Sequence, residues 1–120
     1  MNNAELGRDG EERAVRHLKK EKYILVRRNY RCPAGEIDII AKDGDRLCFI
    51  EVKTRRSLKF GKPQDAVNAV KRKKIMRAAL YFLKETKMEN RSFRFDVVAV
   101  MDEVKLFKDA FCFNGGRYII

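Results

Sequence analysis

Histidine, proline and cysteine are scarce in this 120-residue chain, which contains one, two and three of them respectively. Cys32, Cys48 and Cys112 lie far apart, and no Cys-x-x-Cys pair occurs. His17, the one histidine, cannot complete a zinc site with them. Scattered cysteines in odd number favour reduced thiols in a cytosolic protein. The sequence therefore argues against a zinc module and against a disulfide-stapled secreted domain.

Long apolar runs and linkers are also absent. No segment approaches eighteen consecutive apolar residues, so no membrane span is expected. The first residues, Met1 to Glu5, lack the apolar stretch of a signal peptide. No repeat or Ser/Gly/Pro-rich linker divides the chain. We therefore expect one cytoplasmic domain over residues 1–120 and no association with membranes.

Positive charge is abundant. The chain has 28 Lys and Arg against 17 Asp and Glu, for a net charge of +11, and its hydrophobic content of 45% is enough for a folded core. A field of this size favours polyanions, of which nucleic acid is the commonest. The alternative at this stage is a soluble basic protein, ribosome-associated or otherwise, without such a substrate.

Hydrophobic periodicity predicts an α/β fold. Helical spacing is seen at 4–20 and 64–84, and strand patterns at 23–30, 36–41, 47–53 and 94–100, with a short partner strand at 104–107. Residues 111–120 are ambiguous. The apolar stripe of the second helix consists of Val67, Val70, Ile75, Ala78, Ala79, Phe82 and Leu83. The expected order is α-β-β-β-α-β(-β), a mixed β-sheet flanked by α-helices.

A β-hairpin is predicted where an Asp-Gly-Asp segment separates two apolar strands. With a two-residue loop at Asp43-Gly44, Asp38 lies diagonal to Glu51, and with a loop at Gly44-Asp45 it lies directly opposite. Both registers place Asp38, Glu51 and Lys53 on one face. A three-residue loop would separate them.

Two carboxylates within roughly 5–8 Å of each other across a ladder repel one another. A divalent cation is a natural compensation, since Mg²⁺ takes a few carboxylate oxygens and keeps several waters. Lys53, one pleat beyond Glu51, brings its charge to the same place. The pattern therefore favours a metal site at Asp38 and Glu51. The alternative is that each carboxylate pairs with one of the many Lys and Arg side chains.

Glu11 is a third candidate acid. It precedes the apolar positions of the first helix by three, four and seven residues, so it lies on or beside the inward face. A carboxylate near a buried face needs a partner. The alternative, a first-turn acid favoured by the helix dipole, suits Glu5 and Asp9 better than Glu11.

Basic residues follow the acidic strand closely. From Lys53 to Arg77 the chain has ten Lys or Arg and a single acid, Asp65. A charge run is usually a solvated face, but this excess beside two carboxylates suits a phosphate backbone. Lys71 lies four residues from both Val67 and Ile75, so we expect it to point toward the sheet.

These residues resemble a known constellation. Gly35-Glu36-Ile37-Asp38, a hairpin, then Phe49-Ile50-Glu51-Val52-Lys53 is similar to the D…(D/E)-x-K core of PD-(D/E)XK nucleases, with Ile37 in the place of the proline. The archaeal Holliday-junction resolvases are a characterised branch with this core. Gly7-Arg8-Asp9-Gly10-Glu11 resembles the resolvase helix that supplies a further acid, which matches Glu11 here.

The resemblance is closer to the YraN-like uncharacterised protein family of bacteria, and it covers most of the chain, from Gly7 to Val100. The matching segments are Gly7…Gly10-Glu11, Asn29-Tyr30-Arg31, Gly35-Glu36-Ile37-Asp38, Glu51-Val52-Lys53-Thr54-Arg55, Phe60-Gly61, Ala66-Val67…Lys71 and Arg94-Phe95-Asp96-Val97-Val98.

The nuclease resemblance implies a restriction-endonuclease-like fold and hydrolysis of DNA phosphodiester bonds, with branched or junction DNA among the substrates. Asp38, Glu51 and the Val52 carbonyl would hold Mg²⁺ or Mn²⁺. Lys53 would orient or deprotonate the attacking water and stabilise the developing charge. Glu11 would bind a second metal or its water.

The expected nucleic-acid contacts are Arg31, Arg55, Arg56, Lys71, Lys74 and Arg77. DNA is expected rather than RNA, and homodimerisation is left open. Two rival functions remain at this stage. One is a non-catalytic nucleic-acid-binding protein that retains the nuclease fold. The other is a protein-interaction module whose acids only form ion pairs.

Overall fold

The computed structural model describes residues 2–55 and 68–111. Their elements are α1 (Asn3–Lys20), β1 (Ile24–Cys32), β2 (Gly35–Asp43), β3 (Arg46–Thr54), α2 (Ala69–Glu85), β4 (Phe93–Val100) and β5 (Val104–Phe111). The predicted order of helix, three strands, helix and two strands is confirmed. The last strand is longer than predicted, and neither helix is long and apolar enough to span a membrane.

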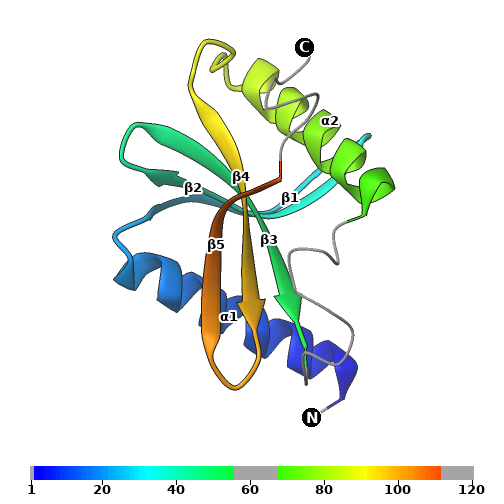
Figure 1. The fold of residues 1–120 in the computed structure, drawn as a ribbon. Helices are drawn as coiled ribbons and strands as arrows, with labels where there is room; N and C mark the ends of the chain where they lie inside the picture. Colours follow the sequence, from blue (N-terminus) through cyan, green and yellow to red (C-terminus); the bar gives the residue numbers. More distant parts are fainter. Residues whose placement is uncertain (1, 56–67, 112–120) are drawn as a thin grey trace.

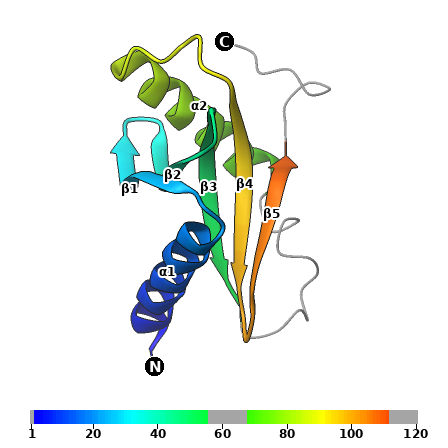
Figure 2. The same cartoon turned by 90° about the vertical axis from the view of Figure 1, so that its left-hand side faces the viewer.

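The described strands form one sheet in the order β1-β2-β3-β4-β5. β3 and β4 run parallel, whereas the other neighbours are antiparallel. Parallel neighbours need a long crossover, and α2 is the helix of that crossover. The helices cover opposite faces of the sheet (Figures 1 and 2). Side chains alternate along β3, so that Phe49 packs with the buried residues of α2, whereas Cys48 and Ile50 pack with those of α1.

The β2–β3 hairpin adopts the second of the two predicted registers. Asp43 pairs with Arg46, so the loop consists of Gly44 and Asp45. Gly44 has a φ of 62°, a left-handed conformation that glycine adopts without steric cost. This loop sets the register of every later pair along the two strands.

α1 begins with a capping box, in which Asn2 and Glu5 satisfy each other's backbone N–H groups. Its buried side consists of Gly10 and of the three apolar residues that the helical spacing predicts, Ala14, Val15 and Leu18. Gly10 lies where α1 crosses the end of β3, and a Cβ there would come within 2.1 Å of the Thr54 hydroxyl oxygen. The absence of a side chain at Gly10 therefore allows the close approach that brings α1 to the end of β3.

α2 begins at Ala69 after an Asn68 cap, and the predicted residues 64–67 lie outside the described part of the chain. Its buried residues start at Ile75 and include Phe82 and Leu83, as predicted. Val70 was expected in the apolar stripe but is 66% exposed. That expectation was wrong because the first turn of α2 precedes the part of the helix that packs on the sheet.

Candidate metal and catalytic site

Asp38 and Glu51 meet where β2 and β3 begin to separate. The ladder pairs Ile39 with Ile50, and the same register places Asp38 opposite Glu51. At this point a side chain continues the hydrogen bonding between the two strands, because the Asp38 Oδ2 accepts a hydrogen bond from the Val52 N–H at 2.8 Å. The hairpin thus brings the two predicted carboxylates together and holds the first against the strand of the second.

Glu51 is nearly buried and its Oε1 contacts two ammonium groups. The Nζ of Lys53 lies 3.5 Å away on the same strand, and Lys71 reaches the same oxygen from α2 as an ion pair. A buried carboxylate needs such compensation. Among the described residues no Lys or Arg forms an ion pair with Asp38. The alternative in which each carboxylate pairs with a Lys or Arg side chain therefore holds for Glu51 but not for Asp38.

The environment of Asp38 disfavours its negative charge. Its pKa is raised to about 7, first by burial and then by the charge of Glu51, against the opposing effect of the Val52 N–H. The carboxylate pair therefore retains a proton over part of the range below neutral pH. A divalent cation beside both groups would offset their repulsion and release that proton.

The two lysines respond differently to the site. Burial lowers the pKa of the Lys53 ammonium, and the neighbouring Lys71 lowers it further, against the attraction of Glu51. Burial also acts to lower the pKa of Lys71, but its hydrogen bond to Glu51 helps to raise that pKa above the ordinary value. Lys53 therefore gives up its proton more readily, a property suited to a proton carrier. Lys71 is suited to neutralising charge.

Glu11 approaches Asp38 from the α1 side. The two residues line a hollow of about 340 Å³, together with Val52 and Thr54. The Oε1 of Glu11 is buried with no hydrogen-bond partner, and the nearest cation is Arg28 at 3.6 Å. Asp38 also lines a second hollow of about 170 Å³ with Glu51. It therefore lies between the two other predicted acids.

The donors around Asp38 are oxygen atoms, the ligands that hard divalent cations prefer. Within residues 2–55 and 68–111, no three His, Cys, Asp or Glu side chains are placed to hold one. Asp38 and Glu51 supply two carboxylates, and the Val52 carbonyl faces the same gap because the N–H and C=O of a strand residue point to the same neighbour. Two carboxylates, one carbonyl and water suit Mg²⁺ or Mn²⁺. The Glu11 Oε1, which has no hydrogen bond, and the Asp38 carboxyl, whose pKa is raised, are groups that a bound cation would stabilise.

The family model of the uncharacterised protein family UPF0102 matches residues 10–100. The chain belongs to the UPF0102 family. A UPF0102 protein of Caldicellulosiruptor saccharolyticus is 50% identical over 118 residues, covering 92% of this chain and 100% of that protein. One of Desulfosudis oleivorans is 50% identical over 111 residues, covering 90% of each. The membership predicted from the YraN-like motifs is confirmed.

Two of the basic residues predicted to contact nucleic acid lie at the site of this UPF0102 chain. Lys71 and Lys74 line the hollow that holds Asp38 and Glu51. Lys74 is exposed, and a Cβ added at Gly35, the first residue of β2, would be in ordinary contact with its Cβ at 3.7 Å. These lysines supply positive charge on the α2 side of the carboxylate pair.

The other four are spread more widely. Arg55 follows β3 and its guanidinium donates to the Thr54 carbonyl at 3.1 Å. Arg31 is largely exposed and pairs with Glu36 at 3.1 Å. Arg77 lines a separate hollow further along α2, and Arg56 lies outside the described residues.

Arg28 of this UPF0102 chain was not among the residues predicted for the site. This β1 residue bonds Glu12 at 2.6 Å and lies beside Glu11, so it ties α1 to the edge of the sheet. The sequence gives little indication of this role. Arg27 and Arg28 are adjacent, and only the register of β1 decides which of them faces α1. The pairing of Arg28 with Ile39 turns it toward α1.

A second unanticipated feature is a buried network built around Asp96 of β4. Asp96 is fully buried and accepts hydrogen bonds from the Arg94 side chain at 2.9 Å, from the Tyr23 hydroxyl at 3.0 Å and from the Asp109 N–H at 2.9 Å. Arg94 also reaches Asp43 at 2.6 Å. The network is fully paired and links β2, β4 and β5, which fits a structural role.

Proposed function

We propose that this protein is a metal-dependent nuclease of the PD-(D/E)XK superfamily that hydrolyses phosphodiester bonds in DNA, with branched DNA as the leading substrate. One observation carries the proposal: Asp38 and Glu51 are brought together at the parting of two strands, with Lys53 beside them. The mixed sheet with helices on both faces is consistent with a restriction-endonuclease-like fold.

Each residue has a distinct task in this proposal. Asp38, Glu51 and the Val52 carbonyl would hold Mg²⁺ or Mn²⁺, which when bound polarises phosphate and acidifies water. Lys53 orients the attacking water or accepts its proton, and its lowered pKa favours the second task. As the water oxygen bonds to phosphorus, the bond to the leaving sugar oxygen breaks. Glu11, on the far side of Asp38, is placed to contact a second cation or its water.

The phosphate backbone would lie along the α2 side of the site. Lys71 and Lys74 line the hollow beside the carboxylates, and Arg55 extends from the end of β3. The net charge of +11 would attract DNA from a distance. We expect the proposed activity in the cytoplasm, where the free thiols of Cys32 and Cys48 would remain reduced.

A second candidate function is non-catalytic binding of nucleic acid. It is favoured by the two lysines on Glu51, which neutralise this carboxylate without any metal ion. Such a protein would bind DNA with an affinity that falls steeply with salt, because lysine–phosphate contacts release counterions. It would leave every substrate intact.

The deciding experiment measures cleavage of a four-way junction, a flap, a linear duplex and a single strand. Each substrate is incubated with Mg²⁺, with Mn²⁺ and with EDTA. We expect cleavage by the wild type with metal only, and none by Asp38→Asn or Glu51→Gln. Lys105→Gln, a change of an exposed cation on β5, serves as the control and should cut normally. If the wild type cuts nothing with either metal yet binds DNA, the second candidate replaces the first.

A further inference from the structure

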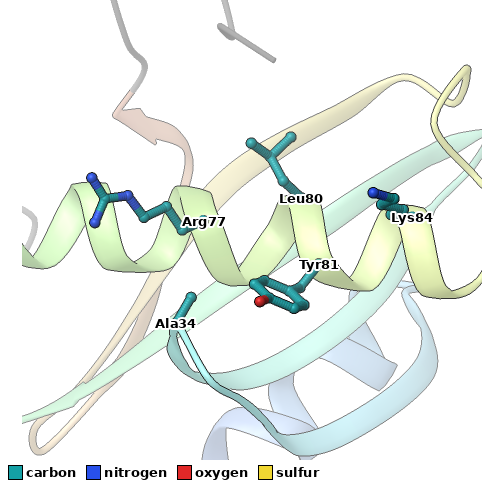
Figure 3. Close-up of a pocket in the computed structure, with 5 residues that line it drawn as sticks. All are labelled: Ala34, Arg77, Leu80, Tyr81 and Lys84. Carbon is teal, nitrogen blue, oxygen red and sulfur yellow. The ribbon is translucent and has the colours of Figure 1, made fainter.

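A hollow lies along α2, next to the candidate site and lined by different residues. It measures about 430 Å³ and is lined by Ala34, Arg77, Leu80, Tyr81 and Lys84. Figure 3 shows Tyr81 beside Ala34 of the β1–β2 turn, with Arg77 and Lys84 on either side of it along the helix. A volume of this size is within the range of small-molecule sites, roughly 300–1,000 Å³.

The lining combines an exposed aromatic ring, an apolar surface and two cations. Tyr81 is 47% exposed, so one of the larger aromatic rings of the chain faces solvent instead of the core. Leu80 and Ala34 extend the apolar surface, while Arg77 and Lys84 place a cation four residues before and three after the tyrosine. An exposed ring between cations can stack a base while the cations contact the neighbouring phosphates.

The hollow continues the candidate site along the same helix face. Lys74 lines the hollow of Asp38 and Glu51, and Arg77 and Tyr81 follow at intervals of three and four residues. On the opposite wall, Gly35 lines the first hollow and Ala34 the second. From Lys74 to Tyr81 the helix rises about 10 Å, a distance that a few nucleotides of a single strand can span.

We propose that this hollow binds an unpaired nucleobase on Tyr81, in a single-stranded segment a few nucleotides from the phosphodiester held at Asp38 and Glu51. The inference rests on the proposed function, and it specifies the substrate as one that contains a single-stranded region. A base within a duplex is stacked on its neighbours and paired, so its face is closed to Tyr81.

The test compares binding of a labelled single-stranded oligothymidylate and of a blunt duplex of the same length, in EDTA. Tyr81→Ala should weaken single-strand binding by roughly 5- to 150-fold, the equivalent of about 1–3 kcal/mol for one stacked base. Tyr81→Phe keeps the ring and should bind as the wild type does. Val70→Ala, at an exposed apolar residue in the first turn of the same helix, should change nothing. Duplex binding should be equal in all four proteins.

An oligonucleotide with one abasic residue locates the stacked base. Scanning that residue along the strand should weaken wild-type binding most at one position and leave Tyr81→Ala binding unaffected there. Equal single-strand affinities in wild type and Tyr81→Ala would overturn the proposal, as would a loss in Tyr81→Phe equal to that in Tyr81→Ala. An unchanged affinity with altered sedimentation of Tyr81→Ala would instead assign the hollow to protein contact.

The outcomes separate this inference from the proposed nuclease activity. Cleavage by wild type and by Tyr81→Ala with the same single-strand affinity would leave the nuclease proposal standing and overturn the Tyr81 subsite. Conversely, if neither protein cuts but only Tyr81→Ala loses single-strand affinity, the subsite stands and the catalytic proposal fails.

Discussion

Lys71 of α2 forms an ion pair with the same Glu51 oxygen that Lys53 approaches to 3.5 Å within β3. The side chain of Glu51 is 8% exposed, whereas that of Lys71 is 41% exposed, so the lysine can leave without uncovering the strand. A metal ion on Glu51, as in the proposed function, would therefore compete with Lys71 for the same carboxylate.

Removing Lys71 should strengthen metal binding. In Lys71→Met, Glu51 loses one of its two cations, and Mn²⁺ affinity should rise by about 2- to 5-fold, since a half-exposed ion pair contributes about 0.5–1 kcal/mol. Calorimetric titration with Mn²⁺ measures this. Lys74→Met is the matched control, because Lys74 lines the same hollow without an ion pair to Glu51. Equal affinities in wild type and Lys71→Met would contradict the competition.

Asp38 should make the metal-free protein less stable as pH rises. A carboxyl with a higher pKa in the folded than in the unfolded chain binds an extra proton on folding, so stability falls through the interval between the two pKa values. For Asp38 that interval runs from 3.8 to about 7. Asp38→Asn cannot ionise, so in EDTA it should match the wild type near pH 4 and exceed it by roughly 1–3 kcal/mol at pH 8.

Urea unfolding at both pH values measures the difference. Asp45→Asn, in the exposed turn of the same hairpin, controls for the loss of one negative charge from a chain with a net charge of +11. If the free energy of unfolding of Asp38→Asn differed from that of the wild type by the same amount at pH 4 and pH 8, the pKa of the Asp38 carboxyl would not be raised by its surroundings.

Lys53 separates catalysis from binding. In a nuclease, Lys53→Ala should lower the cleavage rate by about 10²–10³ while the affinity for DNA changes little, because its charge acts mainly in the transition state. Single-turnover cleavage and DNA binding on the same junction substrate give both numbers. Lys105→Ala removes an exposed cation of β5 and should leave both unchanged. Parallel losses of rate and affinity in Lys53→Ala would make it a phosphate contact only.

The sequence predicted the hairpin site because few variables control it. Strand alternation and an Asp-Gly turn left two registers, and both brought Asp38 and Glu51 to one face. Only the structure decides between the two registers, because it places the turn at Gly44-Asp45. The reach of Lys71 toward the sheet followed from helical spacing alone.

Long-range partners could not be predicted in the same way. Nothing in the spacing of Arg28 selects Glu12, 16 residues earlier, since their contact depends on how α1 packs against β1. The Asp96 network includes the hydrogen bond between Tyr23 and Asp96, which lie 73 positions apart in the sequence. Their contact depends on how the loop that contains Tyr23 packs against β4. Arg94 and Asp96 lie on one face of β4 because side chains alternate along a strand, and this was the one local indication of the network in the sequence.

The contact between α1 and β3 offers a stability test with an internal control. Gly10→Ala puts a Cβ 2.1 Å from the Thr54 hydroxyl oxygen, so either α1 or the Thr54 side chain must shift, and we expect a loss of about 1–3 kcal/mol. Gly7→Ala, one turn earlier, meets nothing within 4 Å and should stabilise the helix by about 0.5–1 kcal/mol. Urea unfolding distinguishes the opposite signs. Thr54→Ala combined with Gly10→Ala removes the obstructing hydroxyl and should recover part of the loss. Without recovery, the cause would lie elsewhere than in this contact.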